Sequence, residues 1–107
     1  MTRQAGKEVW IGLIEVVPRP GVDLLGTVSG AFVNFLVLAA TESEYRTRVH
    51  AATSERGLTT VKMEDIEPLR LRLTRTSIDD DLMSLAEEIE ECGGFKFGTF
   101  HTFKQEQ

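Results

Sequence analysis

The segment at residues 31–39, Ala-Phe-Val-Asn-Phe-Leu-Val-Leu-Ala, constrains the fold more than any other part of this chain. It is almost continuously apolar, and Asn34 is its one polar interruption. A run of this kind is typical of a strand that is buried on both faces. Such strands lie in the interior of a sheet, so we predict that 31–39 is a central strand.

Four other segments predict strands. Residues 8–17 are rich in β-branched and aromatic side chains, and 58–64 alternate between apolar and polar residues. Residues 69–74, Leu-Arg-Leu-Arg-Leu-Thr, alternate cleanly, as a half-buried strand does. We place a turn at 65–68 between these two segments. The last strand is predicted at 95–103, with a bulge at its internal glycine, Gly98.

Capping signals mark two helices. Thr41, with Glu44 three residues later, fits a capping box and predicts a helix at about 42–56. Ser77 is the predicted cap of a second helix, which ends at Gly93 and Gly94. The apolar residues of this second helix form one narrow stripe. They are Ile78, Leu82, Leu85, Ile89 and Cys92.

The predicted order is therefore β, β, α, β, β, α, β. Without the first strand, residues 31–104 form the βαββαβ unit of the ferredoxin-like fold. We predict an α+β domain with two helices on one face of a mainly antiparallel sheet and an extra N-terminal strand. One conflict stays open. The ferredoxin-like plan places the strands 69–74 and 95–103 on either side of 31–39. The short connection 18–30, however, favours a hairpin in which 8–17 pairs with 31–39. Either the first strand takes another edge or the last strand is displaced.

Size and charge narrow the class of protein. A chain of 107 residues predicts a single domain, 1–107, and we expect frayed ends at 1–7 and 104–107. Twelve basic and 17 acidic residues give a net charge of −5. This charge disfavours a nucleic-acid backbone or an anionic membrane as partner. The single cysteine and the lack of a signal peptide or membrane span predict a cytoplasmic protein.

The acidic residues of the second helix have two interpretations. Glu87, Glu88, Glu90 and Glu91 lie opposite the apolar stripe, so they form either a solvated helix face or a surface that meets a basic partner. The three consecutive aspartates at 79–81 point about 100° apart on a helix, so they do not converge on a metal ion. We expect neither a metal site nor a cofactor.

The loop at 21–30 carries leucines that loops normally lack. Leu24 and Leu25 are expected either to pack on the core of the domain or to contact a partner. Together with the acidic helix they complete the set of candidate partner contacts. That set is Leu24, Leu25, Glu87, Glu88 and Glu91.

A second hypothesis is a small-molecule pocket on the open face of the sheet or in a dimer cleft. Such a pocket requires polar and aromatic side chains that converge on one concavity. Its candidate lining residues are Trp10, Asn34, Arg70, Arg72 and His101.

The stretch from Val9 to Leu25, a strand followed by Pro20 and Gly21, is similar to the start of cofactor-independent monooxygenases of the dimeric α/β-barrel type. Those proteins have a full helix after the Pro-Gly pair, whereas this chain has a short glycine-rich segment. The resemblance implies a small dimeric enzyme, which we keep as the alternative function. The sequence favours a non-enzymatic protein-binding module of the immunity, inhibitor or regulatory type, and we expect a homodimer because an open antiparallel sheet leaves strand edges to protect.

Overall fold

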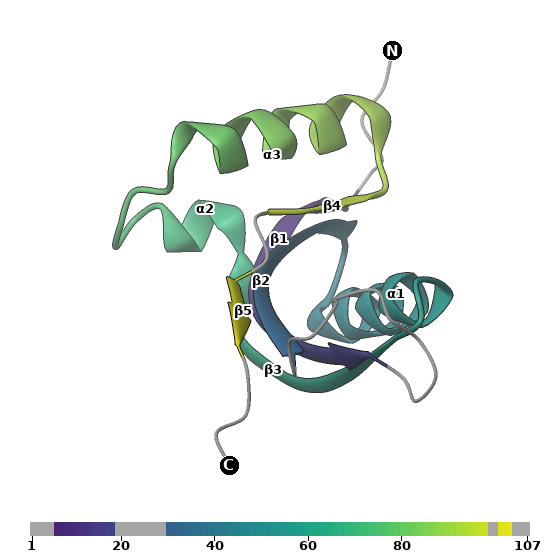
Figure 1. The fold of residues 1–107 in the computed structure, drawn as a ribbon. Helices are drawn as coiled ribbons and strands as arrows, with labels where there is room; N and C mark the ends of the chain where they lie inside the picture. The colour runs from purple at the N-terminus through teal and green to yellow at the C-terminus, as the bar shows by residue number, and fades with distance from the viewer. Residues whose placement is uncertain (1–5, 19–29, 99–100, 104–107) are drawn as a thin grey trace.

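The computed structural model describes residues 6–18 and 30–98, together with the backbone of 101–103. In chain order the elements are β1 (Glu8–Pro18), β2 (Gly30–Ala39), α1 (Glu42–Glu55), β3 (Leu58–Pro68), α2 (Leu69–Arg72), α3 (Asp80–Cys92), β4 (Phe95–Phe97) and β5 (His101–Phe103). The strands form an antiparallel sheet in the order β3-β1-β2-β4, and β5 also pairs with β2 (Figure 1). The predicted α+β class, an antiparallel sheet with helices packed against it, is confirmed.

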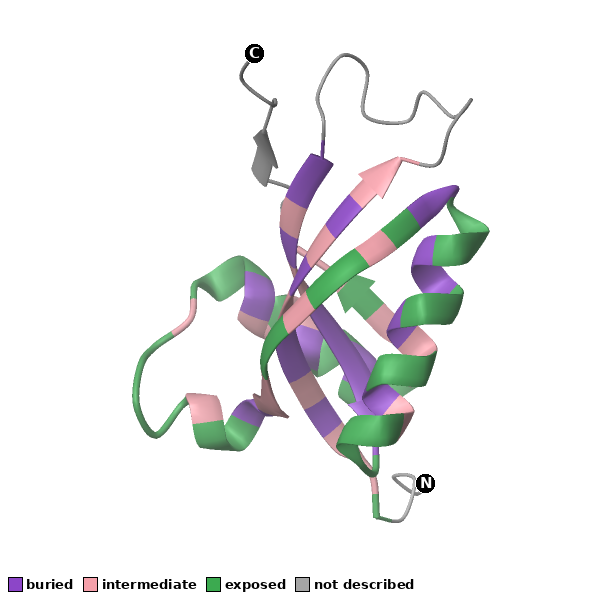
Figure 2. Cartoon of the chain, turned by 90° about the horizontal axis from the view of Figure 1, so that it is seen from below, coloured by how far each residue is buried: buried purple, intermediate pink, exposed green. Residues whose placement is uncertain are grey.

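Strand β2 is the central strand that its apolar sequence predicts. It pairs with β1 along one edge and with β4 and β5 along the other. Most of its residues are buried, as the purple bands in Figure 2 show. Its neighbour β1 pairs with it from Glu8 opposite Ala39 to Val16 opposite Ala31. The short connection between β1 and β2 therefore leads to a hairpin.

The two faces of β2 contact different helices. Phe35 and Val37 belong to a buried cluster that contains Tyr45 of α1. Leu36 belongs to a second cluster, which contains Ile89 of α3. Because successive strand residues point to opposite faces, α1 packs on one side of the sheet and α3 on the other. The prediction that both helices share one face is wrong in this respect, and the double cover explains why 31–39 is apolar throughout.

The strand order also differs from the ferredoxin-like plan predicted for 31–104. In that plan 69–74 is a strand beside β2, but residues 69–72 form the short helix α2 and β1 occupies that edge instead. Leucine and arginine are good helix formers and neither is β-branched, so the local preference of 69–72 opposes a strand. Leu69 is buried, whereas Leu71 and Leu73 are 42% and 41% exposed. The prediction of a half-buried strand at 69–74 is therefore wrong.

The predicted turn at 65–68 is instead a bulge within β3. Ile11 pairs with Glu67 and Leu13 pairs with Glu64, so two β3 residues, 65 and 66, lie opposite one β1 residue. Asp65 has a φ of 56°, in the left-handed region that aspartate tolerates better than most residues. The turn-like composition therefore marks a local break in the pairing, and the strand continues to Pro68.

Helix α1 begins as its capping signal predicts. The Thr41 hydroxyl accepts a 3.1 Å hydrogen bond from the backbone N–H of Glu44, and the Glu44 carboxylate accepts one of 2.8 Å from the N–H of Ala40. Glu44 also forms a 2.8 Å ion pair with Lys7. The hydrogen bonds that this carboxylate accepts, chiefly from Lys7 and then from the Ala40 N–H and Arg48, lower the pKa of Glu44 to about 2. Lys7, near the predicted frayed end, is thereby tied to α1.

Helix α3 begins two residues later than Ser77 predicts. The cap is Asp79, whose carboxylate accepts a 2.8 Å hydrogen bond from the N–H of Leu82. Gly93, with a φ of 78°, ends the helix as predicted. Within the stripe, Leu82 and Ile89 are buried and Leu85 is half-buried, but Cys92 is exposed.

The last predicted strand is present as two short pieces with a bulge between them. Phe97 pairs with Phe35 and His101 pairs with Phe32, so the two pairs are four positions apart along this segment but three apart along β2. The N–H of Gly98 donates a 2.8 Å hydrogen bond to the carbonyl oxygen of Asn34. A β-carbon on Gly98 would lie 3.0 Å from the Leu82 side chain. The register offset begins next to the glycine where the sequence predicts a bulge, and the tight contact with α3 favours glycine there.

Candidate functional site

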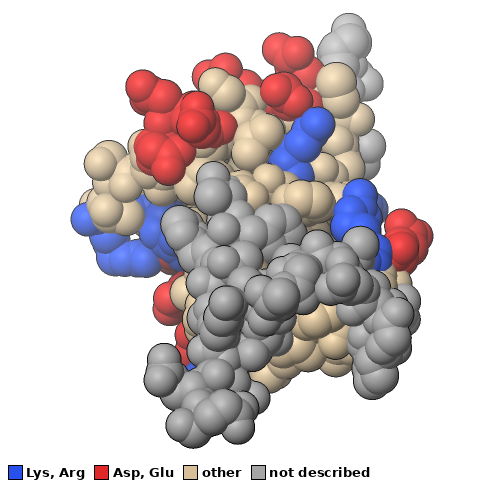
Figure 3. Space-filling view, in the orientation of Figure 1, with Lys and Arg blue, Asp and Glu red and all other residues tan. Residues whose placement is uncertain are grey.

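The surface of α3 is acidic along its length. Asp80 and Asp81 lie in its first turn, and the last six residues include Glu87, Glu88, Glu90 and Glu91, all of them exposed. Figure 3 shows these acidic side chains gathered over α3 at the top of the view. Among the described residues, the one cation that pairs with this helix is Lys96, whose ammonium lies 3.2 Å from Glu88. The acidic face of α3, as we call these four glutamates, is thus largely uncompensated.

A groove of about 240 Å³ runs between α2 and α3. Its apolar lining is Val9, Leu69, Leu73, Met83 and Ala86. Its charged rim consists of Glu87 and Glu90 from α3 and the ion pair between Arg70 and Glu8, which are 2.7 Å apart. Because Glu8 compensates Arg70, Glu87 and Glu90 carry the net charge of the rim. We call this concavity the α2–α3 groove.

A separate cavity of about 370 Å³ lies at the N-terminal end of α3. Asn34, Asp79 and Asp81 contribute its polar lining, and the rest of its lining is Leu82, Leu85, Phe97 and Gly98. Part of this lining also stabilises the fold, because Asp79 caps α3 and the N–H of Gly98 donates a hydrogen bond to the carbonyl oxygen of Asn34. Its volume lies near the lower end of the range for small-molecule pockets, roughly 300–1,000 Å³.

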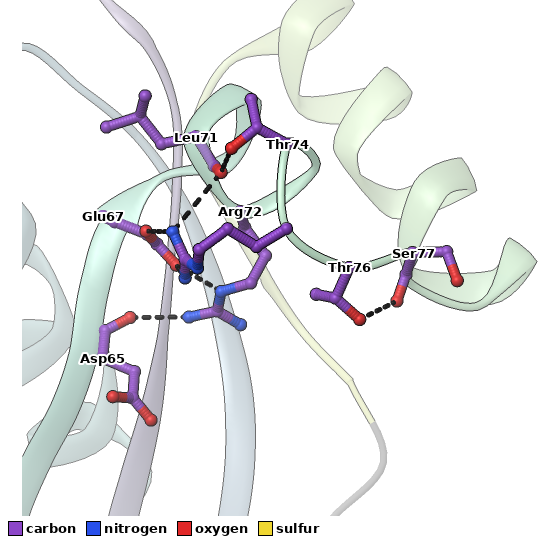
Figure 4. A network of polar contacts seen from close by, with 8 residues as sticks. Asp65, Glu67, Leu71, Arg72, Thr74, Thr76 and Ser77 are labelled. Atoms are coloured by element: carbon purple, nitrogen blue, oxygen red, sulfur yellow. Dashed lines mark hydrogen bonds and ion pairs between the residues drawn. The ribbon is translucent and has the colours of Figure 1, made fainter.

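Two arginines share one carboxylate where β3 ends and α2 begins (Figure 4). Arg72 donates to Glu67, and Arg75 donates to the same carboxylate over 2.6 and 2.8 Å. Arg72 also donates a 2.7 Å hydrogen bond to the carbonyl oxygen of Asp65, at the β3 bulge. The hydrogen bonds from Arg75 and Arg72 lower the pKa of Glu67 to about 2. This network fixes the bulge and the start of α2.

The structure does not bring the predicted pocket residues together. Trp10 packs against the cluster on the α1 side of the sheet, and its buried indole N–H has no hydrogen-bond partner among the described residues. Asn34 lies between Val33 and Phe35 on β2, so it points to the other side, into the cavity at α3. Arg70 lines the α2–α3 groove and Arg72 belongs to the Glu67 network. His101 lies on β5, where only the backbone is described.

Of the predicted partner contacts, the structure describes only the acidic ones. Leu24 and Leu25 lie outside the described residues. Glu87 lies on the rim of the α2–α3 groove, whereas Glu88 and Glu91 lie on α3 away from it. Glu87 and Arg70, assigned to different sites from the sequence, therefore line one concavity.

The groove and the cavity include residues that are absent from the two sets of candidate site residues predicted from the sequence. Glu90, Leu73 and Met83 line the groove, and Asp79 and Asp81 line the cavity. The spacing of Glu87 and Glu90, three apart, was a usable signal because such residues share one side of a helix. The position of Leu73 in the groove could not be predicted in this way, because the direction of its side chain depends on residues 69–72 forming a helix.

Within residues 6–18 and 30–98, no three histidine, cysteine, aspartate or glutamate side chains are placed to hold a metal ion. None of the helices in the described part of the chain is long and apolar enough to cross a membrane. No protein-family model, curated protein or solved structure matches this chain.

Proposed function

We propose that this protein is a non-enzymatic binding module, of the immunity, inhibitor or regulatory type, which contacts a basic surface of a partner protein through the acidic face of α3. One observation carries the proposal: four exposed glutamates lie in the last six residues of α3. The C-terminal end of a helix has negative potential, so the carboxylates in the last turn, Glu90 and Glu91, are each unfavourable by about 0.3–1 kcal/mol. Like charges three or four positions apart add about 0.2–0.5 kcal/mol per pair.

A basic partner surface would turn this internal repulsion into a favourable interaction. Local rules are broken most often where function requires it, which favours binding over mere solvation of the helix. Complementary charge speeds association and selects partners, and it makes binding weaken as salt rises. The cytoplasm is the compartment that we predict for this interaction.

The test is affinity purification from the native host with the wild-type protein and with a variant in which Glu87, Glu88, Glu90 and Glu91 are all changed to glutamine. A control matched in charge neutralises four exposed acids elsewhere, which are Glu42 and Glu55 of α1 and Glu64 and Asp65 of β3. The partner that mass spectrometry identifies should bind the wild-type and control proteins, and calorimetry should give an affinity that falls with added salt. Equal affinity of the partner for the α3 variant would refute the proposal.

A small-molecule site is the second candidate, and the cavity at the N-terminal end of α3 favours it. Asn34, which the sequence nominated for a pocket, lines this cavity beside two carboxylates and three large apolar side chains. Such a lining suits a small amine with an apolar body. Titration with phenethylamine, followed by NMR of the Asn34 side-chain amide, tests this candidate, and an unshifted amide signal would exclude that ligand class.

A homodimer stays a prediction. Strand β3 is the end strand of the described sheet, but it carries two pairing irregularities, and Lys62 and Pro68 lie on it. Bulges, lysine and proline are features by which edge strands avoid pairing with another chain. We therefore expect a dimer to use another surface. Light scattering should give twice the chain mass of 12.0 kDa, and the mass of a monomer would exclude the dimer.

A further inference from the structure

We infer that the α2–α3 groove binds an arginine side chain from a basic segment of a partner protein, with the aliphatic stem on the apolar floor and the guanidinium between Glu87 and Glu90. This inference rests on the proposed function and names the part of the acidic surface that anchors the partner. It starts from the size of the groove, about 240 Å³. That volume is below the roughly 300–1,000 Å³ typical of small-molecule pockets, so a single side chain fits better than a free ligand.

The lining of the groove matches both ends of an arginine side chain. Leu73 is 41% exposed and Met83 is half-buried, so both present apolar surface that the stem of an arginine can cover. Glu87 and Glu90 lie one turn apart on the same side of α3. Their carboxylates are within reach of one planar guanidinium, which can donate to two acceptors at once.

The charge of the rim favours a cation over any anion. Glu8 already compensates Arg70 at 2.7 Å, and within the described residues no cation pairs with Glu87 or Glu90. The groove therefore has apolar walls with two uncompensated carboxylates at one side. Lysine carries a similar stem but only a point charge, so it should bind more weakly than arginine at this site.

The chain offers two matched controls for this groove. Leu71 is 42% exposed, almost the same as Leu73, but it does not line the groove. Glu88 and Glu91 lie on the same helix as Glu87 and Glu90 but away from the groove, so neutralising either pair changes the net charge equally. Differences within each matched set isolate the groove from the general negative charge of α3.

The experiment measures binding of three short, end-blocked peptides to the full chain. The peptides differ only at one position: the first contains leucine and arginine, the second leucine and lysine, and the third leucine and citrulline. The ¹³C-methyl signal of Met83 reports on the groove, and that of Met63, which packs in the cluster on the α1 side, serves as the internal control. The leucine–arginine peptide should bind most tightly, the lysine peptide more weakly and the uncharged citrulline peptide least. Binding should shift the Met83 signal while the Met63 signal stays in place.

The variants then decide between the groove and the wider acidic surface. Leu73→Ser and the double change Glu87→Gln, Glu90→Gln should each weaken binding of the leucine–arginine peptide about tenfold, the effect of roughly 1.4 kcal/mol. Leu71→Ser and Glu88→Gln, Glu91→Gln should change it by less than about threefold. If each control variant weakened peptide binding as much as its groove counterpart, the groove would not be the binding site, and only a general interaction with the acidic face of α3 would remain. The arginine site would also be refuted if the leucine–arginine peptide did not bind the wild-type chain. The proposed function is refuted by a different result, equal affinity of the host partner for the wild-type protein and for the variant without the four α3 glutamates.

Discussion

The backbone of Gly12 lies directly against the hydroxyl of Tyr45: a β-carbon added to Gly12 would lie 2.6 Å from the Tyr45 oxygen. That hydroxyl donates a 2.8 Å hydrogen bond to the carbonyl oxygen of Phe35. Burial raises the pKa of Tyr45 far above its ordinary value, which keeps the hydroxyl protonated as a donor. The contact between β1 and α1 thus depends on the absence of one methyl group.

We predict that Gly12→Ala destabilises the protein by about 1–3 kcal/mol, the usual cost of adding a group to a filled core. The tyrosine must shift, and its hydrogen bond to Phe35 is weakened. In a background of Tyr45→Phe, which removes the oxygen, Gly12→Ala should cost clearly less. A double-mutant cycle in urea measures this coupling, and additive effects of the two changes would contradict the close contact.

The buried side of α3 gives a second prediction. Ile89 is fully buried, so Ile89→Ala should cost about 2–5 kcal/mol. Leu85 is only half-buried, so Leu85→Ala should cost less than Ile89→Ala. Chemical denaturation of the two variants checks the order, and a larger loss for Leu85→Ala would mean that α3 presents another face to the sheet.

The exposure of Cys92 gives a third. The sequence places it on the apolar stripe, but the helix ends beside it and the thiol is exposed. We expect the folded protein to react with an uncharged thiol reagent such as iodoacetamide at a rate close to that of the unfolded chain, at a salt concentration that screens the glutamates of α3. A rate that rises strongly on unfolding would show a buried thiol instead.

How far the sequence predicts the fold depends on whether local and long-range preferences agree. They agree for 31–39 and for the Thr41–Glu44 cap, and both predictions are confirmed. They disagree at 69–74, where an alternating pattern suits a strand but leucine and arginine favour a helix. The pattern alone could not reveal this, because alternation of apolar and charged residues over so few positions fits one helical turn as well.

The wrong prediction of a strand at 69–74 is also the reason why the α2–α3 groove could not be predicted from the sequence. In a strand, Arg70 and Arg72 point to the same face, and on that basis both are predicted to line one pocket. In a helix they point about 200° apart, so Arg70 reaches the groove and Glu8 while Arg72 turns to Glu67. The acidic face of α3 was predictable because it depends only on helical spacing, whereas the α2–α3 groove depends on how two helices pack.

The Glu67 network gives a prediction in pH. The pKa of Glu67 is lowered to about 2 in the folded state, so its contribution is fully present above the usual value of 4.5 and is lost as the pH falls toward 2. Glu44 behaves alike for the same reason. Glu67→Gln should lower stability at neutral pH by about 1.5–3 kcal/mol, the typical worth of a hydrogen bond to a charged group. It should also flatten the loss of stability between pH 4.5 and 2, and an unchanged pH profile would mean that Glu67 is not paired in solution.

The last prediction concerns how much the acidic face of α3 lowers the stability of the folded protein. Glu90 and Glu91 lie in the last turn, where the helix dipole disfavours carboxylates, and Glu87 repels both of them at helical spacing. We therefore expect the double change Glu90→Gln, Glu91→Gln to stabilise the isolated protein by about 0.5–1.5 kcal/mol.

Asp80 and Asp81 provide a control of opposite sign on the same helix. They lie in the first turn of α3, where the dipole favours negative charge, so Asp80→Asn with Asp81→Asn should destabilise the protein although the net charge changes equally. Thermal melts at low salt measure both effects, and salt should shrink both because the charges are exposed. If both double variants shift the melting temperature in the same direction, net charge dominates and the position of the glutamates carries no special strain. If they shift in opposite directions, the glutamates are held where they weaken the helix, as a surface kept for binding would be.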